Sequence, residues 1–137
     1  MAVWQFDLYL APYDSTLPDT STPGWEPVLP NKTVYALQED MAHYFGPPWF
    51  MLGDWIVFGP ENGNRVDLLF EEKSEASIGI RIDTRNEAPQ FLVLITDLAR
   101  LHNCKFFSSG LAEFIEPDSH HVLNAISRWE VRKMGLR

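Results

Sequence analysis

Alternating hydrophobic and polar residues from Ser77 to Asp83 predict a central β-strand. The isoleucines alternate with small or charged residues in the order Ile78, Gly79, Ile80, Arg81, Ile82, Asp83. A period of two places successive side chains on opposite faces of a sheet, so the isoleucines belong to a buried face. The opposite face of this strand is therefore the one that can carry chemistry.

A helix is expected directly after this strand, from about Glu87 to Leu101. Asn86 or Thr84 is the expected N-cap, and Pro89 is tolerated in the first turn. A strand at 105–107 follows, and this strand-helix-strand order predicts that the strands at 77–83 and 105–107 run parallel. The apolar residues of the helix recur at spacings of three and four, as a stripe that can cover a sheet: Phe91, Leu94, Ile95, Leu98 and Leu101.

The remaining elements follow from the same two periods. Residues 3–10 alternate as an interior strand, and residues 49–83 predict a meander of three antiparallel strands. Asn31 or Thr33 is expected to cap a helix through Tyr44, and Asp118 or Ser119 begins a last helix to about Met134. Residues 111–117 are compatible with either a short extra strand or an irregular segment.

The chain has the size and composition of one folded domain. It has 137 residues, of which 45% are hydrophobic, and a proline-rich loop is predicted at 11–30. We expect a single domain over 1–137 with an α+β fold. Its expected form is a two-layer sandwich of one mixed, mostly antiparallel sheet of about five or six strands, with three helices packed on one face.

The acidic residues are concentrated in the first part of the chain. Residues 1–75 carry twelve acids against three bases, a net charge of −9, whereas the remainder carries +1 and the whole chain −8. Such a surface repels phosphate backbones and anionic lipid, which disfavours nucleic-acid and membrane partners and favours a basic protein. On charge alone, however, the favoured interpretation is an acidic surface that only keeps the domain soluble.

No segment indicates export or membrane insertion. The apolar runs are too short to span a bilayer, and the N-terminus lacks a basic region followed by an apolar core. The single cysteine, Cys104, excludes an internal disulfide, and its place at the start of a buried strand favours a core residue. A cytoplasmic protein is expected.

The sheet face opposite the isoleucines carries a mixture of aromatic, aliphatic, acidic and arginine side chains. This mixture is typical of a protein-binding surface with aromatic anchors and charge pairs. Val57, Leu69, Gln5 and Gly79 also fall on this face. With one tryptophan from the loop, the candidate partner-binding residues are Asp7, Tyr9, Trp25, Trp55, Asp67, Glu71, Arg81 and Asp83.

Two charged groupings on this face admit alternative interpretations. Arg81, Asp83 and Arg85 form either a clamp for a ligand or partner, or a cross-strand ion pair with Asp67 or Asp7, which we favour. Asp7 with Asp67 or Glu71 could do acid-base work in a cleft. On a flat exposed face their pKa values would hardly move, so a solvated acidic patch is the favoured interpretation.

The sequence offers no catalytic, metal or cofactor motif. It lacks G-x-S-x-G, a phosphate-binding glycine loop and H-E-x-x-H. His120 and His121 would point about 100 degrees apart on a helix, which disfavours one shared zinc ion. Cys104 and His102 could form a nucleophile pair only in an unfavourable geometry. No catalytic residue, metal or cofactor is therefore assigned, and an enzyme is disfavoured.

Three short patterns carry a resemblance to a known group of proteins. They are W-x-F-D-x-Y-L-x-P at 4–12, I-x-I-R-I-D-x-R at 78–85, and F-I-x-P at 114–117 before a basic-ended helix. With these the chain resembles small acidic bacterial proteins grouped with immunity proteins of polymorphic toxin systems. The resemblance implies tight binding to a cognate toxin domain without catalysis, and it transfers no binding residue.

The sequence thus supports three functional hypotheses. The first is a cytoplasmic, non-catalytic domain of the immunity type, whose acidic and aromatic surface or loop masks a basic toxin. The second is a small-molecule enzyme or ligand-binding domain with a pocket between the 11–30 loop and the sheet. The third is a structural subunit that buries its open face in a homodimer.

Overall fold

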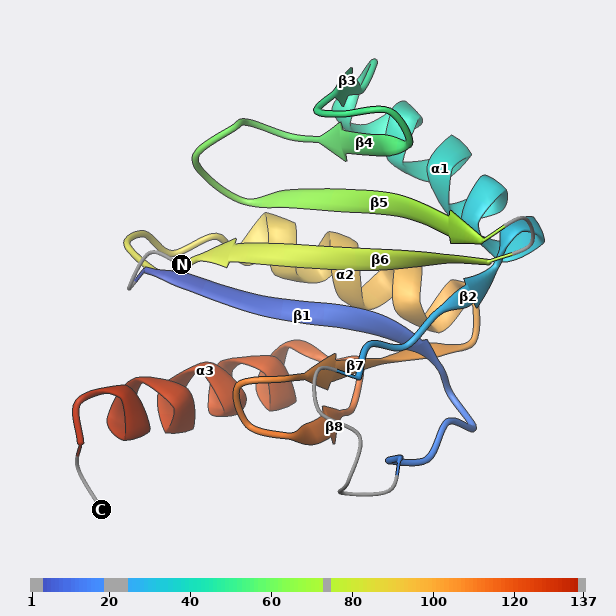
Figure 1. Ribbon diagram of the computed structural model, residues 1–137. Coiled ribbons are helices and arrows are strands. Elements are labelled where there is room, and N and C mark those ends of the chain that lie inside the picture. The colour runs from blue at the N-terminus through green and yellow to red at the C-terminus, as the bar shows by residue number, and fades with distance from the viewer. Residues whose placement is uncertain (1–3, 19–24, 73–74, 136–137) are drawn as a thin grey trace.

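The computed structural model describes residues 4–18, 25–72 and 75–135, which form an α+β fold with one antiparallel sheet and three helices (Figure 1). The helices are α1 (Asn31–Phe45), α2 (Pro89–Leu101) and α3 (Ser119–Lys133). The strands are β1 (Gln5–Pro12), β2 (Leu29–Pro30), β3 (Trp49–Phe50), β4 (Trp55–Phe58), β5 (Arg65–Glu72), β6 (Glu75–Asp83), β7 (Cys104–Ser108) and β8 (Glu113–Ile115). The prediction of five or six strands was too low, because the two-residue strands β2 and β3 are too short to show a period.

Strand β6 occupies the middle of the sheet, as predicted, and β1 lies beside it. The strand order is β3-β4-β5-β6-β1-β7-β8, and β2 also pairs with β6. Because β6 and β7 are each antiparallel to β1, they run parallel to one another, as predicted. They do not pair, however, since β1 lies between them, and α2 therefore connects two strands that are separated by a third.

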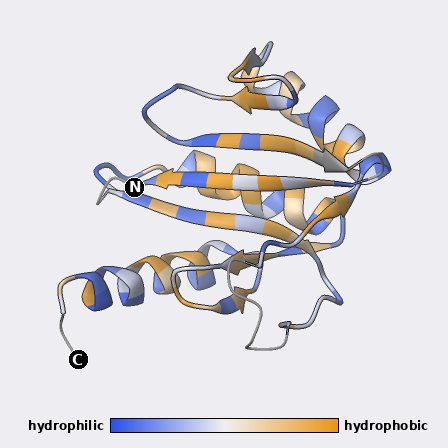
Figure 2. Ribbon diagram, viewed as in Figure 1, coloured by the Kyte–Doolittle hydropathy of each residue, from blue (hydrophilic) through white to orange (hydrophobic). Residues whose placement is uncertain are grey.

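The isoleucine face of the sheet forms the core. Figure 2 shows hydrophobic and hydrophilic residues alternating along β5, β6 and β1. The hydrophobic set, which includes Leu8, Ile78 and Ile80, joins side chains from all three helices in one buried cluster. Figure 1 shows α1 and α2 behind the sheet.

Two expectations about side-chain exposure and capping were wrong. Val57, expected on the water-facing side, is fully buried, and its cross-strand partner there is Trp49 of β3. The N-caps of α1 and α2 are Pro30 and Ala88, and neither makes a side-chain capping hydrogen bond. Asn31, Thr33, Thr84 and Asn86 are thus not the caps. The Thr84 hydroxyl instead donates to the carbonyl oxygen of Trp4 at 2.8 Å, which ties the end of β6 to the start of β1.

Helix α3 begins as predicted, with Asp118 as its N-cap. The Asp118 Oδ1 accepts from the backbone N–H of His121 at 2.8 Å, and this hydrogen bond holds the pKa of Asp118 below its ordinary value. Replacing Asp118 by alanine is expected to lower the free energy of unfolding by about 1 kcal/mol at pH 7. Urea denaturation measures this loss, with Ser119→Ala as the control at the neighbouring position.

The loss should also depend on pH with a defined sign. A carboxyl with a lowered folded pKa contributes stability that is present above its unfolded pKa, here 3.8, and disappears as the pH falls through the folded pKa. The difference between wild type and Asp118→Ala should therefore shrink in acid. A difference that is constant from neutral to acidic pH would contradict an ionised cap.

Candidate functional site

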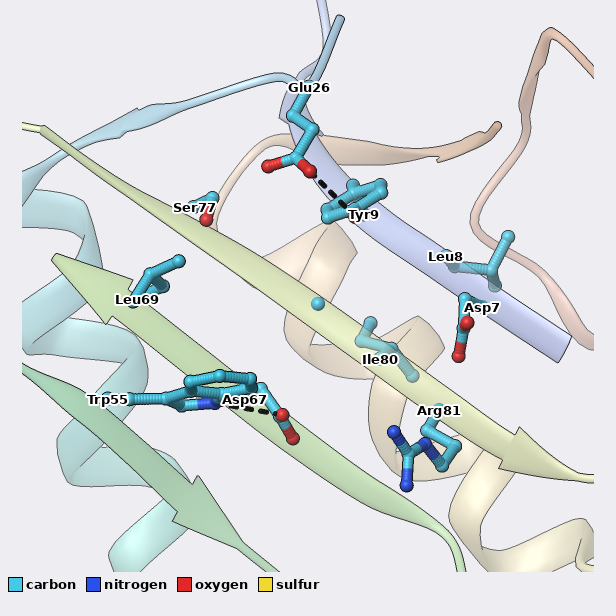
Figure 3. Close-up of a pocket in the computed structure, with 11 residues that line it drawn as sticks. Asp7, Leu8, Tyr9, Glu26, Trp55, Asp67, Leu69, Ser77, Ile80 and Arg81 are labelled. Atoms are coloured by element: carbon cyan, nitrogen blue, oxygen red, sulfur yellow. Dashed lines mark hydrogen bonds between the residues drawn. The ribbon is translucent and has the colours of Figure 1, made fainter. Parts of the chain in front are cut away.

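A hollow of about 240 Å³ opens on the sheet face opposite the isoleucines (Figure 3). Strands β1, β4, β5 and β6 supply most of its wall, and one residue comes from the segment that precedes β2. The lining residues are Asp7, Leu8, Tyr9, Glu26, Trp55, Asp67, Leu69, Ser77, Gly79, Ile80 and Arg81. Five of the eight candidate partner-binding residues are among them: Asp7, Tyr9, Trp55, Asp67 and Arg81.

The hollow exists because Gly79 has no side chain. In the register of the sheet, Gly79 of β6 lies opposite Asp67 of β5 on one side and opposite Tyr9 of β1 on the other. Cross-strand partners point to the same face, so a side chain at position 79 would stand between those two. A Cβ atom there would meet Tyr9 Cε1 at 3.8 Å, an ordinary contact, so the fold itself does not require glycine at this position.

A buried ion pair fixes one wall of the hollow. Arg65 is only 2% exposed, and its Nε lies 2.9 Å from Asp67 Oδ1 while its Nη2 donates to Oδ2 at 3.1 Å. Arg65 Nη1 donates to the carbonyl oxygen of Glu61 at 3.0 Å. Asp67 Oδ2 also accepts from the indole nitrogen of Trp55 at 3.0 Å, so the carboxylate and the tryptophan ring hold each other in place.

Arg81 lies beside Asp7 at the opposite wall. The two are direct cross-strand partners, and the Gln5 amide oxygen, when turned toward Arg81, accepts from Nε at 2.9 Å and from Nη2 at 3.2 Å. Burial raises the pKa of Asp7, against the lowering effect of the Arg81 charge, and the Asp67 charge raises it further. The expectation that carboxylate pKa values on this face would hardly move was therefore wrong for Asp7, because the face is hollowed and not flat.

The raised pKa of Asp7 predicts a pH dependence of stability. A raised folded pKa means that the native state binds the proton more tightly, so ionisation of Asp7 costs stability above that pKa. The cost is relieved as the pH falls toward the unfolded value of 3.8. Asp7→Asn should therefore gain stability relative to wild type as the pH rises from about 4 to 7.

Urea denaturation of both proteins across this range measures the effect, and NMR titration of the Asp7 carboxyl carbon gives the folded pKa directly. Asp97→Asn, at an exposed position on α2, is the matched control. A titration midpoint for Asp7 at or below 3.8 would contradict the burial effect.

The segment that precedes β2 lies against the mouth of the hollow. The Tyr9 hydroxyl donates to Glu26 Oε1 at 3.1 Å (Figure 3). Trp25 packs edge-on against Phe107 and Phe114, with ring centroids 4.9 and 6.2 Å away, and so attaches the segment to β7 and β8. Trp25 is thus an anchor within the fold and does not line the hollow. The centre of the predicted 11–30 loop, residues 19–24, lies outside the described residues.

Asp83, another candidate residue, does not line the hollow. Asp83 is buried and accepts from Arg85 Nε at 2.9 Å and Nη2 at 2.8 Å, and these hydrogen bonds lower the pKa of Asp83. The R-x-D-x-R pattern is therefore divided: Arg81 faces the hollow, and Asp83 pairs with Arg85, whose guanidinium lies over the Trp4 ring. Glu71 belongs to β5, and its side chain lies outside the described part of the structure.

The remaining reactive groups are engaged elsewhere. Cys104 is buried, and burial raises the pKa of its thiol to about 11. The His102 ring binds Asp40 Oδ2 at 2.8 Å, and only the His102 carbonyl oxygen meets the Cys104 sulfur, so the two do not form a nucleophile pair. Within the described residues, no three His, Cys, Asp or Glu side chains are grouped to hold a metal ion.

Two residues of the site, Arg65 and Glu26, were not singled out from the sequence. Arg65 lies two residues before Asp67 and four before Leu69, so strand alternation places all three side chains on the same face, and this spacing could have identified Arg65. Glu26 has no such signal, because it stands in an aperiodic segment.

In the part of the chain that the structure describes, no helix is both long and apolar enough to cross a membrane. Comparison of the chain with protein-family models, curated proteins and solved structures gives no match, so the geometry of the hollow must carry the functional argument.

Proposed function

We propose that this protein is a non-catalytic binding domain that masks a basic protein, in the manner of a cytoplasmic, bacterial immunity-type inhibitor. The observation that carries the proposal is the convergence of five candidate residues on one hollow. Three carboxylates and one guanidinium line it, which gives the lining a formal charge of −2. The proposal includes the finer arrangement expected from the sequence, a two-layer sandwich with all three helices on one face and the hollow on the other.

The composition of this face supports a protein partner. Tyr9 and Trp55 are half-buried aromatic residues beside charged groups, a combination that is enriched at the centres of protein interfaces. The net charge of the whole chain, −8, would attract a basic partner over a long range and raise the association rate. In this proposal the hollow makes the specific contact with the partner, and the overall charge increases the rate at which the two proteins meet.

A charge-reversal experiment tests this proposal. Glu26 is exposed at the mouth of the hollow, and Asp97 is an exposed acid on α2 outside it. Glu26→Lys and Asp97→Lys change the net charge equally, so both variants attract a basic partner equally over a long range. The two variants differ only in whether the new lysine lies at the hollow. Tagged wild type and both variants are used to capture proteins from the native host, and each captured protein is identified and then co-expressed with the bait.

The expected result is a basic protein that wild type and Asp97→Lys retain, that Glu26→Lys loses, and whose activity the wild type suppresses. Capture that is equal for all three baits would place the contact elsewhere. Failure of the wild type to suppress the activity of any basic partner would refute the masking role.

A second candidate function is the binding of a small molecule, because residue 26 and the sheet together enclose the hollow. Arg81 and Tyr9 offer a charged and an aromatic group to such a ligand, whereas Asp83 does not line the hollow. Native mass spectrometry of the purified protein tests the alternative. A bound small molecule in wild type that is absent from Gly79→Val would favour it over a protein partner.

A further inference from the structure

We propose that the hollow takes one arginine side chain of the partner, with the guanidinium seated over Gly79 between Tyr9 and Trp55. This inference rests on the proposed function and specifies the contact group. It follows from three features of the hollow: its uncompensated charge, its aromatic walls and its glycine floor.

The charge of the hollow is unequally compensated. Asp67 is already paired, by Arg65 of the same strand and by the Trp55 indole of β4. Asp7 and Glu26 remain as two further carboxylates, and Arg81 is the one cation among the residues that line the hollow. With Asp67 neutralised by Arg65, the charges of Asp7, Glu26 and Arg81 sum to −1, so one inserted cation would balance them. An anion would add repulsion, and an apolar group would leave the partly buried Asp7 carboxylate without water or a new partner.

The walls favour a planar cation over a compact one. Tyr9 lies on β1 and Trp55 on β4, on either side of the central strand β6, so two aromatic residues flank the floor (Figure 3). A guanidinium stacks on aromatic faces and presents five N–H donors in a fixed fork. The two carboxylates that Arg65 does not pair with, Asp7 on β1 and Glu26 before β2, match such a fork better than a lysine ammonium, which acts as a point charge.

Gly79 provides the depth for this side chain. The position tolerates a Cβ atom, with Tyr9 Cε1 as its nearest neighbour at 3.8 Å, yet it carries none. A glycine in the interior of a strand loses packing and gains chain entropy on unfolding, so it weakens the sheet unless a close approach needs the space. The space above Gly79 is the place where the tip of an incoming side chain comes to rest.

The experiment titrates the protein with N-acetyl-arginine amide and follows the indole N–H signal of Trp55 by NMR, after assignment with Trp55→Phe. N-acetyl-citrulline amide is the neutral analogue of nearly the same shape, and N-acetyl-lysine amide carries the same charge without the fork. We expect saturable binding of the arginine amide, about tenfold weaker or undetectable binding of citrulline, and an intermediate response to lysine. The arginine response should disappear in Gly79→Val and weaken in Gly79→Ala.

Each outcome decides one of the two proposals. Equal responses to arginine and citrulline, a stronger response to lysine, or an unchanged response in both Gly79 variants would overturn the arginine site. Binding and suppression of a basic partner by Gly79→Val would do the same while leaving the masking function intact. Saturable arginine binding without any basic protein partner would keep the site and refute the masking function.

Discussion

Replacement of Asp67 by alanine is expected to lower the free energy of unfolding by about 3–5 kcal/mol, because it leaves the Arg65 charge buried without its carboxylate. The Arg65 side chain is only 3% exposed, and Asp67 is its partner through both Nε and Nη2. The carbonyl oxygen of Glu61 and the ring of Trp49, 5.7 Å from the guanidinium carbon, remain but carry no full negative charge. Urea or thermal denaturation of the purified variant measures the loss.

Two further variants serve as controls for the Asp67→Ala measurement. Asp97→Ala breaks an exposed pair with Arg100, whose N–O distance is 3.9 Å, and should cost at most about 0.5 kcal/mol. The double variant Arg65→Met with Asp67→Leu replaces the pair by apolar groups and should recover most of the lost stability. A loss below about 1 kcal/mol for Asp67→Ala would show that water or another group reaches the guanidinium.

Valine at position 79 is expected to weaken binding of the basic partner by at least about 100-fold without lowering the stability of the fold. Its two methyl groups would occupy the hollow between Tyr9 and Asp67, where the side chain of the partner would otherwise sit. Glycine costs about 0.5–1 kcal/mol in a strand interior and valine favours strands, so the free energy of unfolding should stay level or rise.

Calorimetric titration with the captured partner and urea denaturation measure the two halves of this prediction. Ser127→Val places the same side chain at an exposed position of α3 outside the hollow and should leave binding unchanged. Gly79→Ala, which adds a single methyl group, provides a milder change if valine displaces Tyr9. Full affinity in both Gly79 variants would show that the partner does not enter the hollow.

Much of the site was predictable because alternation assigns every strand residue to a face. The odd positions of β1, β5 and β6 include Asp7, Tyr9, Asp67 and Arg81, and all four line the hollow. Alternation along a strand does not, however, show which residues of neighbouring strands pair with one another. The pairing of Gly79 with both Tyr9 and Asp67, which creates the hollow, therefore became visible only in the folded sheet.

Other features were set by contacts that are distant in sequence. Glu26 reaches the site because Trp25 packs against Phe107 and Phe114, side chains from strands on the far side of β1. The short strands β2 and β3 depend on pairing with β6 and β4 and have no local period. The predicted N-caps of α1 and α2 were wrong, because the residues at these positions are Pro30 and Ala88, which make no side-chain capping hydrogen bond.

The position of β1 between β6 and β7 has a consequence for how the chain acquires its structure. This strand emerges from the ribosome before either neighbour, and its two edges are completed only by residues 79–83 and 104–107. Pairings this far apart in sequence slow folding and leave hydrophobic strands exposed in the meantime. Nascent chains that end before β7 should therefore depend on chaperones, and the hollow can assemble only after β6, which ends at Asp83, has been made.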